Sequence, residues 1–436
     1  MSPTLKLTIL FFDRVLRAFL GLASFIFITN YLEPTQVGIY SLVMAIIAIS
    51  AGFIGLGITS VVVVDAAKDY QENAKIIQQD FFIRLLSSIF ILIISLIFVN
   101  VFYRESEVWL NYLIISIFLV TQISVTFEND LKAKGEPHKI AIIKILPTIF
   151  AFIVKIYFLV TFQSLGLLLT VIAIESIVIL ILFVSLSSLS IKMSITSNLS
   201  INFLKESYSL IKKSAPFLFS FIAMLLYTRI DQFFISKMIG FEQLAIYAVA
   251  MKIHDSALGL IFILNIYFIR HLSENFGTAR FEYLFKGISS LAVSAAFIGL
   301  LLWLFFGDFI LSVFFKEIYQ SSYIVTLILI GGLMVQSVAV VRTNYYVLTK
   351  TQNIVYLSSL LGLIINILLN FTLIPLYGIE GAAVASLISQ IASVLLVNLF
   401  FKKTRKVFLW MIYSLALPFN KYNLKLLKET YLRKIL

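Results

Sequence analysis

Cysteine is absent from this chain of 436 residues, and histidine is rare. Without thiols the chain cannot form disulfides, zinc–thiolate sites, iron–sulfur clusters or a cysteine nucleophile. The three histidines, His138, His254 and His271, are too few and too scattered for a histidine-built metal centre. We therefore expect neither a metal site nor a cofactor.

Charged residues are also scarce: they make up 13% of the chain, whereas 61% of it is hydrophobic. With a mean hydropathy of +1.02 the chain is too apolar for a soluble domain of this length. The composition predicts an all-α polytopic membrane protein. A P-loop, an HExxH motif and an Asp-x-Asp pair are missing from the sequence, which argues against ATP hydrolysis and against an enzyme in general.

Long apolar runs define the expected crossings, at about 20 residues each. The sequence predicts twelve transmembrane helices, near residues 9–30, 38–64, 82–102, 108–127, 140–161, 165–188, 215–237, 243–269, 287–306, 323–348, 354–376 and 381–401. The short run 309–315 is expected to pack at the interface, and 407–418 forms either an interfacial helix or a further crossing. Most lysines and arginines outside the runs fall on one side, which places both termini in the cytoplasm.

An internal repeat divides the chain into halves. Residues 36–44 (QVGIYSLVM) and 243–251 (QLAIYAVAM) share four of nine positions. Two further echoes keep the same order: the turn at Lys134 matches the turn at Lys350, and 164–166 matches 378–381. These echoes predict two six-helix bundles in a parallel repeat, related by a pseudo-twofold axis along the membrane normal. The predicted organisation is an N-terminal bundle, a cytoplasmic linker, a C-terminal bundle and a basic cytoplasmic tail, at 1–190, 191–214, 215–402 and 403–436.

Seven cations interrupt the apolar runs, and they are the candidate cargo-binding residues: Arg14, Arg17, Lys144, Lys155, Arg229, Lys252 and Arg342. A cation at the bilayer centre costs roughly 3 kcal/mol, so we expect these side chains to line a polar interior rather than to face lipid. A cationic interior favours an anionic cargo such as a phosphate on a lipid or sugar carrier. Snorkelling and internal ion pairing are the structural alternatives.

Spacing relates several of these charges to one another. Asp13 lies four residues before Arg17, which allows an intrahelical ion pair. Lys144 and Lys155 are eleven residues apart and should share one face of a helix. Arg84, near a helix end, is expected to snorkel.

Three carboxylates within the apolar runs are candidates for binding a coupling ion, H+ or Na+: Glu175, Asp231 and Asp255. Asp231 and Asp255 lie close in sequence to Arg229 and Lys252, and a paired structural cluster is the alternative reading of these four. Pairing with Lys155 is the alternative role of Glu175.

Polar and small residues inside the predicted helices have simpler expected roles. Asn366 and Asn370 are expected to form interhelical hydrogen bonds, with sugar binding as the alternative. Gly52, Gly55 and Gly57 are expected to allow close packing or bending.

Three segments carry a family resemblance: 32–40 (LEPTQVGIY), 229–236 (RIDQFFIS) and 375–382 (PLYGIEGA). With these segments in this order, the chain resembles the polysaccharide flippases of the multidrug/oligosaccharidyl-lipid/polysaccharide exporter (MOP) superfamily, most closely the O-antigen (Wzx-type) flippases. The resemblance implies a V-shaped, MATE-like pair of six-helix bundles around a cationic cavity.

The implied activity is transport without catalysis. An undecaprenyl-diphosphate-linked oligosaccharide, an O-antigen or related unit of lipopolysaccharide, would move from the cytoplasmic to the periplasmic leaflet of a bacterial inner membrane by ion-coupled alternating access. The implied partners are this cargo, membrane lipid, H+ or Na+ and other polysaccharide assembly proteins, but no nucleic acid. The alternatives are a multidrug/cation antiporter, a membrane enzyme of glycan assembly, and a lipid II flippase, which typically has two more helices than this chain has room for.

Overall fold

The computed structural model describes residues 3–68, 73–104, 106–186, 201–351, 353–420 and 422. Within these ranges the chain is built from helices and contains no β-strand. It divides into two compact units, Met1–Arg229 and Ile230–Leu436, called here the N-terminal and C-terminal units. The predicted boundary at 190/191 and the end of the predicted tail lie outside the described residues, and the boundary between the two units falls within α11 (Ile201–Met238).

Nine helices of the described chain are long and apolar enough to cross a membrane. This finding confirms the predicted all-α polytopic membrane protein, while the count of twelve crossings stays a prediction. The long helices α1 (Pro3–Tyr31) and α11 are not among the nine. Both carry several charged residues.

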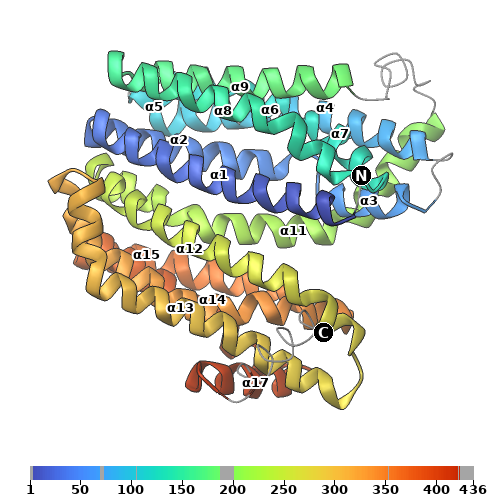
Figure 1. Ribbon diagram of the computed structural model, residues 1–436. Coiled ribbons are helices and arrows are strands. Elements are labelled where there is room, and N and C mark those ends of the chain that lie inside the picture. The colour runs from blue at the N-terminus through green and yellow to red at the C-terminus, as the bar shows by residue number, and fades with distance from the viewer. Residues whose placement is uncertain are drawn as a thin grey trace. The chain divides into compact units, whose positions relative to one another are not determined.

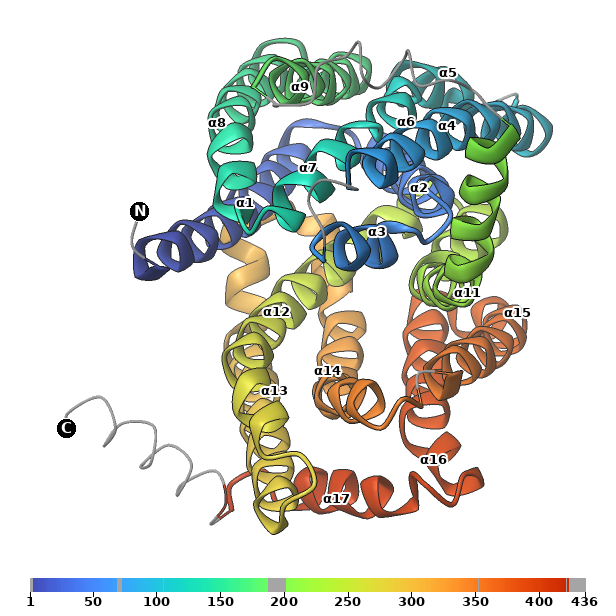
Figure 2. The ribbon, with the colours of Figure 1, turned by 90° about the vertical axis from the view of Figure 1, so that its right-hand side faces the viewer.

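The N-terminal unit contains α1, α2 (Pro34–Phe53), α3 (Thr59–Ala66), α4 (Asn73–Tyr103), α5 (Glu107–Ile115), α6 (Ile117–Thr121), α7 (Ser124–Ala133), α8 (Pro137–Phe162), α9 (Leu165–Leu186) and the first part of α11. Helix α8 packs against both α1 and α9, and the three run alongside one another (Figure 1). Figure 2 shows α7 lying between α8 and α4, in contact with both.

The single helix predicted at 38–64 is wrong, because the chain breaks between α2 and α3. Gly55, Leu56 and Gly57 adopt φ values of 79°, 50° and 74°. Glycine accepts this left-handed region without the steric penalty that a Cβ brings. Two glycines around one strained leucine therefore end α2 and redirect the chain into α3.

A buried ion pair faces this break. Arg84 donates to Asp80 at 3.0 Å and to Thr59 Oγ1 at 2.6 Å, and the pair is almost completely buried. Asn129 donates to the other oxygen of Asp80 at 3.2 Å. The expected snorkelling of Arg84 is therefore wrong, because a carboxylate one turn away keeps the guanidinium in the interior. The network joins α3, α4 and α7.

The C-terminal unit contains α12 (Phe241–Glu274), α13 (Ala279–Phe314), the 3-10 turn η1 (Glu317–Ser321), α14 (Ser322–Leu348), α15 (Asn353–Gln390), the π-helical turn η2 (Ile391–Leu396), α16 (Val397–Phe400) and α17 (Arg405–Ala416). Helix α14 is central, since it contacts α12, α13 and α15. The separate interfacial element predicted at 309–315 is wrong, because α13 continues through it.

The end of the C-terminal unit contains the last two predicted crossings and the segment 407–418. The predicted crossings 354–376 and 381–401 appear as α15, with a kink at Gly378 (φ 59°, ψ −138°), followed by η2 and α16. Helix α17 has 12 residues and so rises roughly 18 Å, less than the roughly 30 Å of hydrocarbon that a crossing needs. It packs Val407 and Met411 into a cluster with α13 and α14, so it does not form a further crossing.

Candidate functional site

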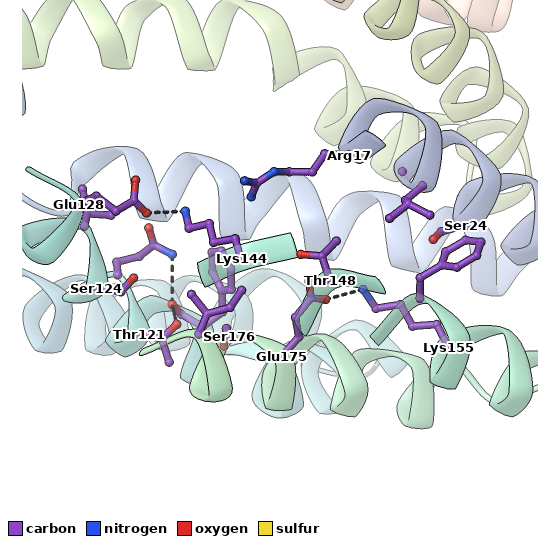
Figure 3. Close-up of a pocket in the computed structure, with 17 residues that line it drawn as sticks. Arg17, Ser24, Thr121, Ser124, Glu128, Lys144, Thr148, Lys155, Glu175 and Ser176 are labelled. Carbon is purple, nitrogen blue, oxygen red and sulfur yellow. Dashed lines mark hydrogen bonds and ion pairs between the residues drawn. The ribbon is translucent and has the colours of Figure 1, made fainter. Parts of the chain in front are cut away.

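A cavity of about 440 Å³ lies in the N-terminal unit, lined by α1, α6, α7, α8 and α9 (Figure 3). Three of the seven predicted cargo-binding cations line it: Arg17, Lys144 and Lys155. The ion-coupling candidate Glu175 lines it as well. Residues more than 100 positions apart in the sequence thus meet around one polar space.

Helical spacing explains how α8 supplies one wall. Lys144, Thr148, Phe152 and Lys155 all line the cavity, and their steps of four, four and three residues keep them on one face of a helix. The prediction that the two lysines share a face is confirmed. Pro147 lies between them inside α8 and removes one backbone hydrogen-bond donor.

The pair of Lys155 and Glu175 joins α8 to α9. Lys155 Nζ lies 2.6 Å from Glu175 Oε2, and the two side chains are 15% and 14% exposed. The expected alternative role of Glu175, pairing with Lys155, is confirmed. At this depth each charge offsets much of the desolvation cost of the other.

Lys144 forms a second interhelical ion pair, with Glu128 of α7. Glu128 also lies 3.5 Å from Lys132 Nζ, one turn further along α7. Glu128 was not predicted as a site residue, because it stands just beyond the predicted helix 108–127. The available signal was a polar stripe: Thr121, Ser124 and Glu128 follow one another at helical spacing, and all three line the cavity.

Arg17 is the third cation of the cavity, and its predicted intrahelical pair is confirmed. Its Nη2 lies 2.5 Å from Asp13 Oδ1 and 2.6 Å from Oδ2. Arg14, one turn before Arg17, is exposed on α1 and does not line the cavity. Arg17, Lys144 and Lys155 thus each face a carboxylate, so the cavity is charge-paired rather than simply cationic.

Arg342 of α14 is buried away from this cavity, in the core of the C-terminal unit. Its Nη1 donates to the carbonyl oxygens of Ser393 at 3.2 Å and Val394 at 2.6 Å, both in the π-helical turn η2. The guanidinium also lies 5.1 Å from the ring centre of Tyr346. Because a π-helical turn disturbs the usual helical hydrogen bonds, these contacts favour a structural role for Arg342.

Asp231 is buried in a polar cluster of the C-terminal unit. Its carboxylate accepts hydrogen bonds from the Tyr247 hydroxyl and from the Gln232 backbone N–H, the latter at 2.9 Å. Asp255 is more exposed and lies 3.1 Å from His254 Nδ1. Arg229 and Lys252 are half-buried, and neither lines the cavity of the N-terminal unit.

The expected hydrogen bond between helical segments is present for Asn366, whereas Asn370 bonds within its own segment of α15. Asn366 Nδ2 donates to Ser386 Oγ at 3.3 Å, across the kink at Gly378, and Asn370 Nδ2 donates to Asn366 Oδ1 at 2.8 Å. In the part of the chain that the structure describes, no group of three or more His, Asp or Glu side chains is placed to hold a metal ion.

Two carboxyl groups outside the membrane-spanning helices have a lowered pKa. Hydrogen bonds from Lys213 and Lys68 lower the pKa of Asp65 in α3. A hydrogen bond from Lys139 lowers the pKa of Glu136, just before α8. Both groups stabilise the fold in their ionised form.

Residues 6–267 match the family of polysaccharide biosynthesis proteins, and this match spans more than half of the chain. The chain belongs to that family. The family resemblance seen in the sequence is thereby confirmed. A comparison with curated protein sequences finds no significant match.

Solved structures show which fold this polysaccharide biosynthesis protein has. It is similar to the lipid II flippase MurJ in an inward closed conformation, with a TM-score of 0.74, 18% identity, and coverage of 95% of this chain and 92% of that one. It is also similar to an inward-facing MATE multidrug transporter of the MOP superfamily, with a TM-score of 0.66, 15% identity, and coverage of 92% and 94%. A third similar structure is a MOP superfamily transporter from Pyrococcus furiosus, with a TM-score of 0.61, 13% identity, and coverage of 94% of each chain.

These likenesses establish the MurJ- and MATE-like fold of the protein and confirm the predicted fold class. At this level of identity they show the fold alone. The expectation that a lipid II flippase has two more helices than this chain stays a prediction.

Proposed function

We propose that this polysaccharide biosynthesis protein is a flippase for an undecaprenyl-diphosphate-linked oligosaccharide, an O-antigen or related repeat unit of lipopolysaccharide. It moves the cargo from the cytoplasmic to the periplasmic leaflet of a bacterial inner membrane by alternating access. Family membership and the MOP fold support this proposal. The observation that carries it is the cavity with Arg17, Lys144 and Lys155 among membrane-spanning helices.

A diphosphate is the cargo group that this cavity suits. Its negative charge crosses the hydrocarbon only if cations accompany it, and buried opposite charges attract far more strongly than they do in water. Lys144 and Lys155 are separated by a rise of about 16 Å along α8. One phosphate group therefore contacts one lysine at a time, and the two lysines form successive stations along the path.

Hydroxyl groups of the same lining suit the sugar part of the cargo. Thr121, Ser124, Thr148 and Ser176 line the cavity beside the charged pairs. Hydroxyls both donate and accept hydrogen bonds, as sugar hydroxyls require. Transport without catalysis agrees with the transporters and flippases that share the fold.

The other predicted cations receive different assignments. Arg14, Arg229 and Lys252 remain proposed contacts for the cargo at other stages of transport. Arg342 is assigned to stabilising the turn η2, because its guanidinium already binds two backbone carbonyls.

Ion coupling is proposed to reside in the C-terminal unit, at Asp231. A buried carboxylate that shares a hydrogen bond with Tyr247 is suited to bind H+ or Na+, because a bound cation relieves the cost of burying its charge. Asp255 is a further candidate, whereas Glu175 is paired with Lys155 in the cavity. Asp231→Asn is expected to leave the protein in the membrane and to abolish the dependence of transport on the ion gradient.

The test is a strain that lacks the gene, complemented with defined variants. Loss of surface polysaccharide, with lipid-linked oligosaccharide trapped in the cytoplasmic leaflet, is the expected phenotype. Wild-type protein should restore the glycan, and Lys144→Met with Lys155→Met should not. Lys139→Gln is the matched control, since Lys139 is an exposed lysine of α8 that pairs with Glu136 outside the cavity. Unchanged glycan with increased drug sensitivity would instead identify a multidrug antiporter.

A further inference from the structure

We propose that Glu128 and Glu175 are exchangeable counter-ions of the cavity. Each carboxylate holds one lysine until a phosphate oxygen of the cargo takes its place, and the displaced carboxylate then binds a proton. The proposal rests on the proposed function, because it assumes a diphosphate cargo. It assigns these two glutamates a role in binding that differs from structural ion pairing.

The geometry separates the two pairs from the other ion pairs of the unit. Lys144–Glu128 joins α8 to α7, and Lys155–Glu175 joins α8 to α9. Figure 3 shows them at separate places along the cavity. Because the partners come from different helices and both face open space, rotation of the side chains can separate them without unfolding a helix.

The pair of Arg84 and Asp80 provides the contrast. Its side chains are 4% and 0% exposed, and Thr59 and Asn129 hold it from two further helices. No lining residue of the cavity belongs to this network. An incoming phosphate has no access to that pair, whereas it meets Lys144 and Lys155 directly.

Charge balance requires the proton. When a phosphate oxygen replaces Glu128 at Lys144, the carboxylate loses its nearer cation and keeps only Lys132, 3.5 Å away, so this largely buried site disfavours the ionised form. One ion pair is broken, one lysine–phosphate pair is formed, and one proton joins the carboxylate. The same exchange applies to Glu175 at Lys155.

Several charged and titratable groups surround Glu175 and Glu128, the two carboxylates that are proposed to take up a proton. Glu175 faces Lys155 of α8 and lies near Tyr40 of α2. Glu128 faces Lys144 of α8 and Lys132 of its own helix, and Arg17 of α1, which is paired with Asp13, lines the same space. Because the complex holds more protons than the free protein, binding strengthens as the pH falls.

The proton exchange does not itself couple transport to a proton gradient. A proton that is taken up with the cargo leaves when the cargo leaves and the lysine recovers its carboxylate. The exchange therefore draws no energy from an inward proton gradient. It makes the empty and loaded cavities similar in net charge, and energy coupling stays with Asp231.

The experiment is calorimetric titration of the purified full-length protein with geranylgeranyl diphosphate, in two buffers of different ionisation enthalpy. The wild type should take up about one proton more per bound probe than the variant Glu128→Gln/Glu175→Gln, because the probe's own titration is common to both. The double variant should bind roughly tenfold tighter, the equivalent of about 1.4 kcal/mol. Glu136→Gln, which removes a half-buried carboxylate that is paired with Lys139 outside the cavity, should match the wild type.

Equal proton uptake in the wild type and the double variant would overturn the exchange. If the double variant does not fold, Glu128→Asp and Glu175→Asp replace it. Each shortened carboxylate holds its lysine less well, so tighter binding of the probe is expected and unchanged or weaker binding overturns the proposal. If lipid-linked oligosaccharide is flipped only when the gene is present, but proton uptake is equal or the probe does not bind, the exchange alone is refuted. Flipping that continues without the gene refutes the proposed function itself.

Discussion

Replacing Lys155 with methionine tests whether this lysine binds cargo or only neutralises Glu175. The change leaves Glu175, which is 14% exposed, without the cation that lies 2.6 Å from it. Loss of one partner from a fully buried pair costs roughly 3–5 kcal/mol. Because Glu175 lines a cavity that admits water or a proton, we expect a smaller loss of stability, about 2 kcal/mol.

The second change, Glu175→Gln in the Lys155→Met background, removes the uncompensated charge. Thermal stability in detergent should return to near the wild-type value, while transport of lipid-linked oligosaccharide should stay at least tenfold reduced. Lys139→Gln should leave transport unchanged and lower thermal stability only slightly, because its pair with Glu136 is largely solvent-accessible. Wild-type transport by the double variant would refute the reasoning, because Lys155 would then serve only to neutralise Glu175.

Further predictions concern the core and the charged surface of the N-terminal unit. Asp80→Asn should lower stability by roughly 3 kcal/mol or more, because it leaves a buried guanidinium without its carboxylate, and Asp80→Leu with Arg84→Met should recover most of this loss in the same thermal melts. Gly55→Ala should cost roughly 1–3 kcal/mol, because φ is 79° and the new Cβ would lie 2.5 Å from Arg84 Nη1; an unchanged melting temperature would contradict this. The pKa of Asp65 is lowered by Lys213, so this contribution to stability is complete above the unfolded pKa of about 3.9 and is lost as the pH falls through the lower folded pKa. Stability measured from neutral pH down to about pH 3 should therefore fall less steeply in Asp65→Asn.

The membrane fold was predictable because hydropathy and helix length act locally. Apolar runs of crossing length marked the helices, and the segments 36–44 and 243–251 lie in the first turns of α2 and α12, in their separate units. The break between α2 and α3 was not predictable from hydropathy, because the residues around Gly55 and Gly57 are as apolar as the helices they separate. Their backbone is determined by tertiary contacts, including those of Arg84.

The candidate site was predictable only in part. Periodicity along one helix placed Lys144 and Lys155 on a common face, and a spacing of four residues gave the pair of Arg17 and Asp13. Glu128 was missed because it stands just beyond the predicted helix 108–127; spacing along its own helix places it on a polar stripe but carries no information about its contact with Lys144 of α8. The assignment of Arg342 as a cargo contact had the same weakness, since its partners are backbone carbonyls about 50 residues away.

Reconstitution measures directly whether this protein moves a lipid-linked oligosaccharide across a membrane. Purified protein would be placed in liposomes that contain fluorescent undecaprenyl-diphosphate-linked oligosaccharide, and a membrane-impermeant glycosidase would report how much of the sugar is exposed outside. We expect wild-type protein to make the inner-leaflet pool accessible. Lys144→Met with Lys155→Met should do so far more slowly, and Lys139→Gln should not differ from the wild type. An inner pool that stays protected with the wild-type protein, or equal access with the double variant, would contradict this expectation.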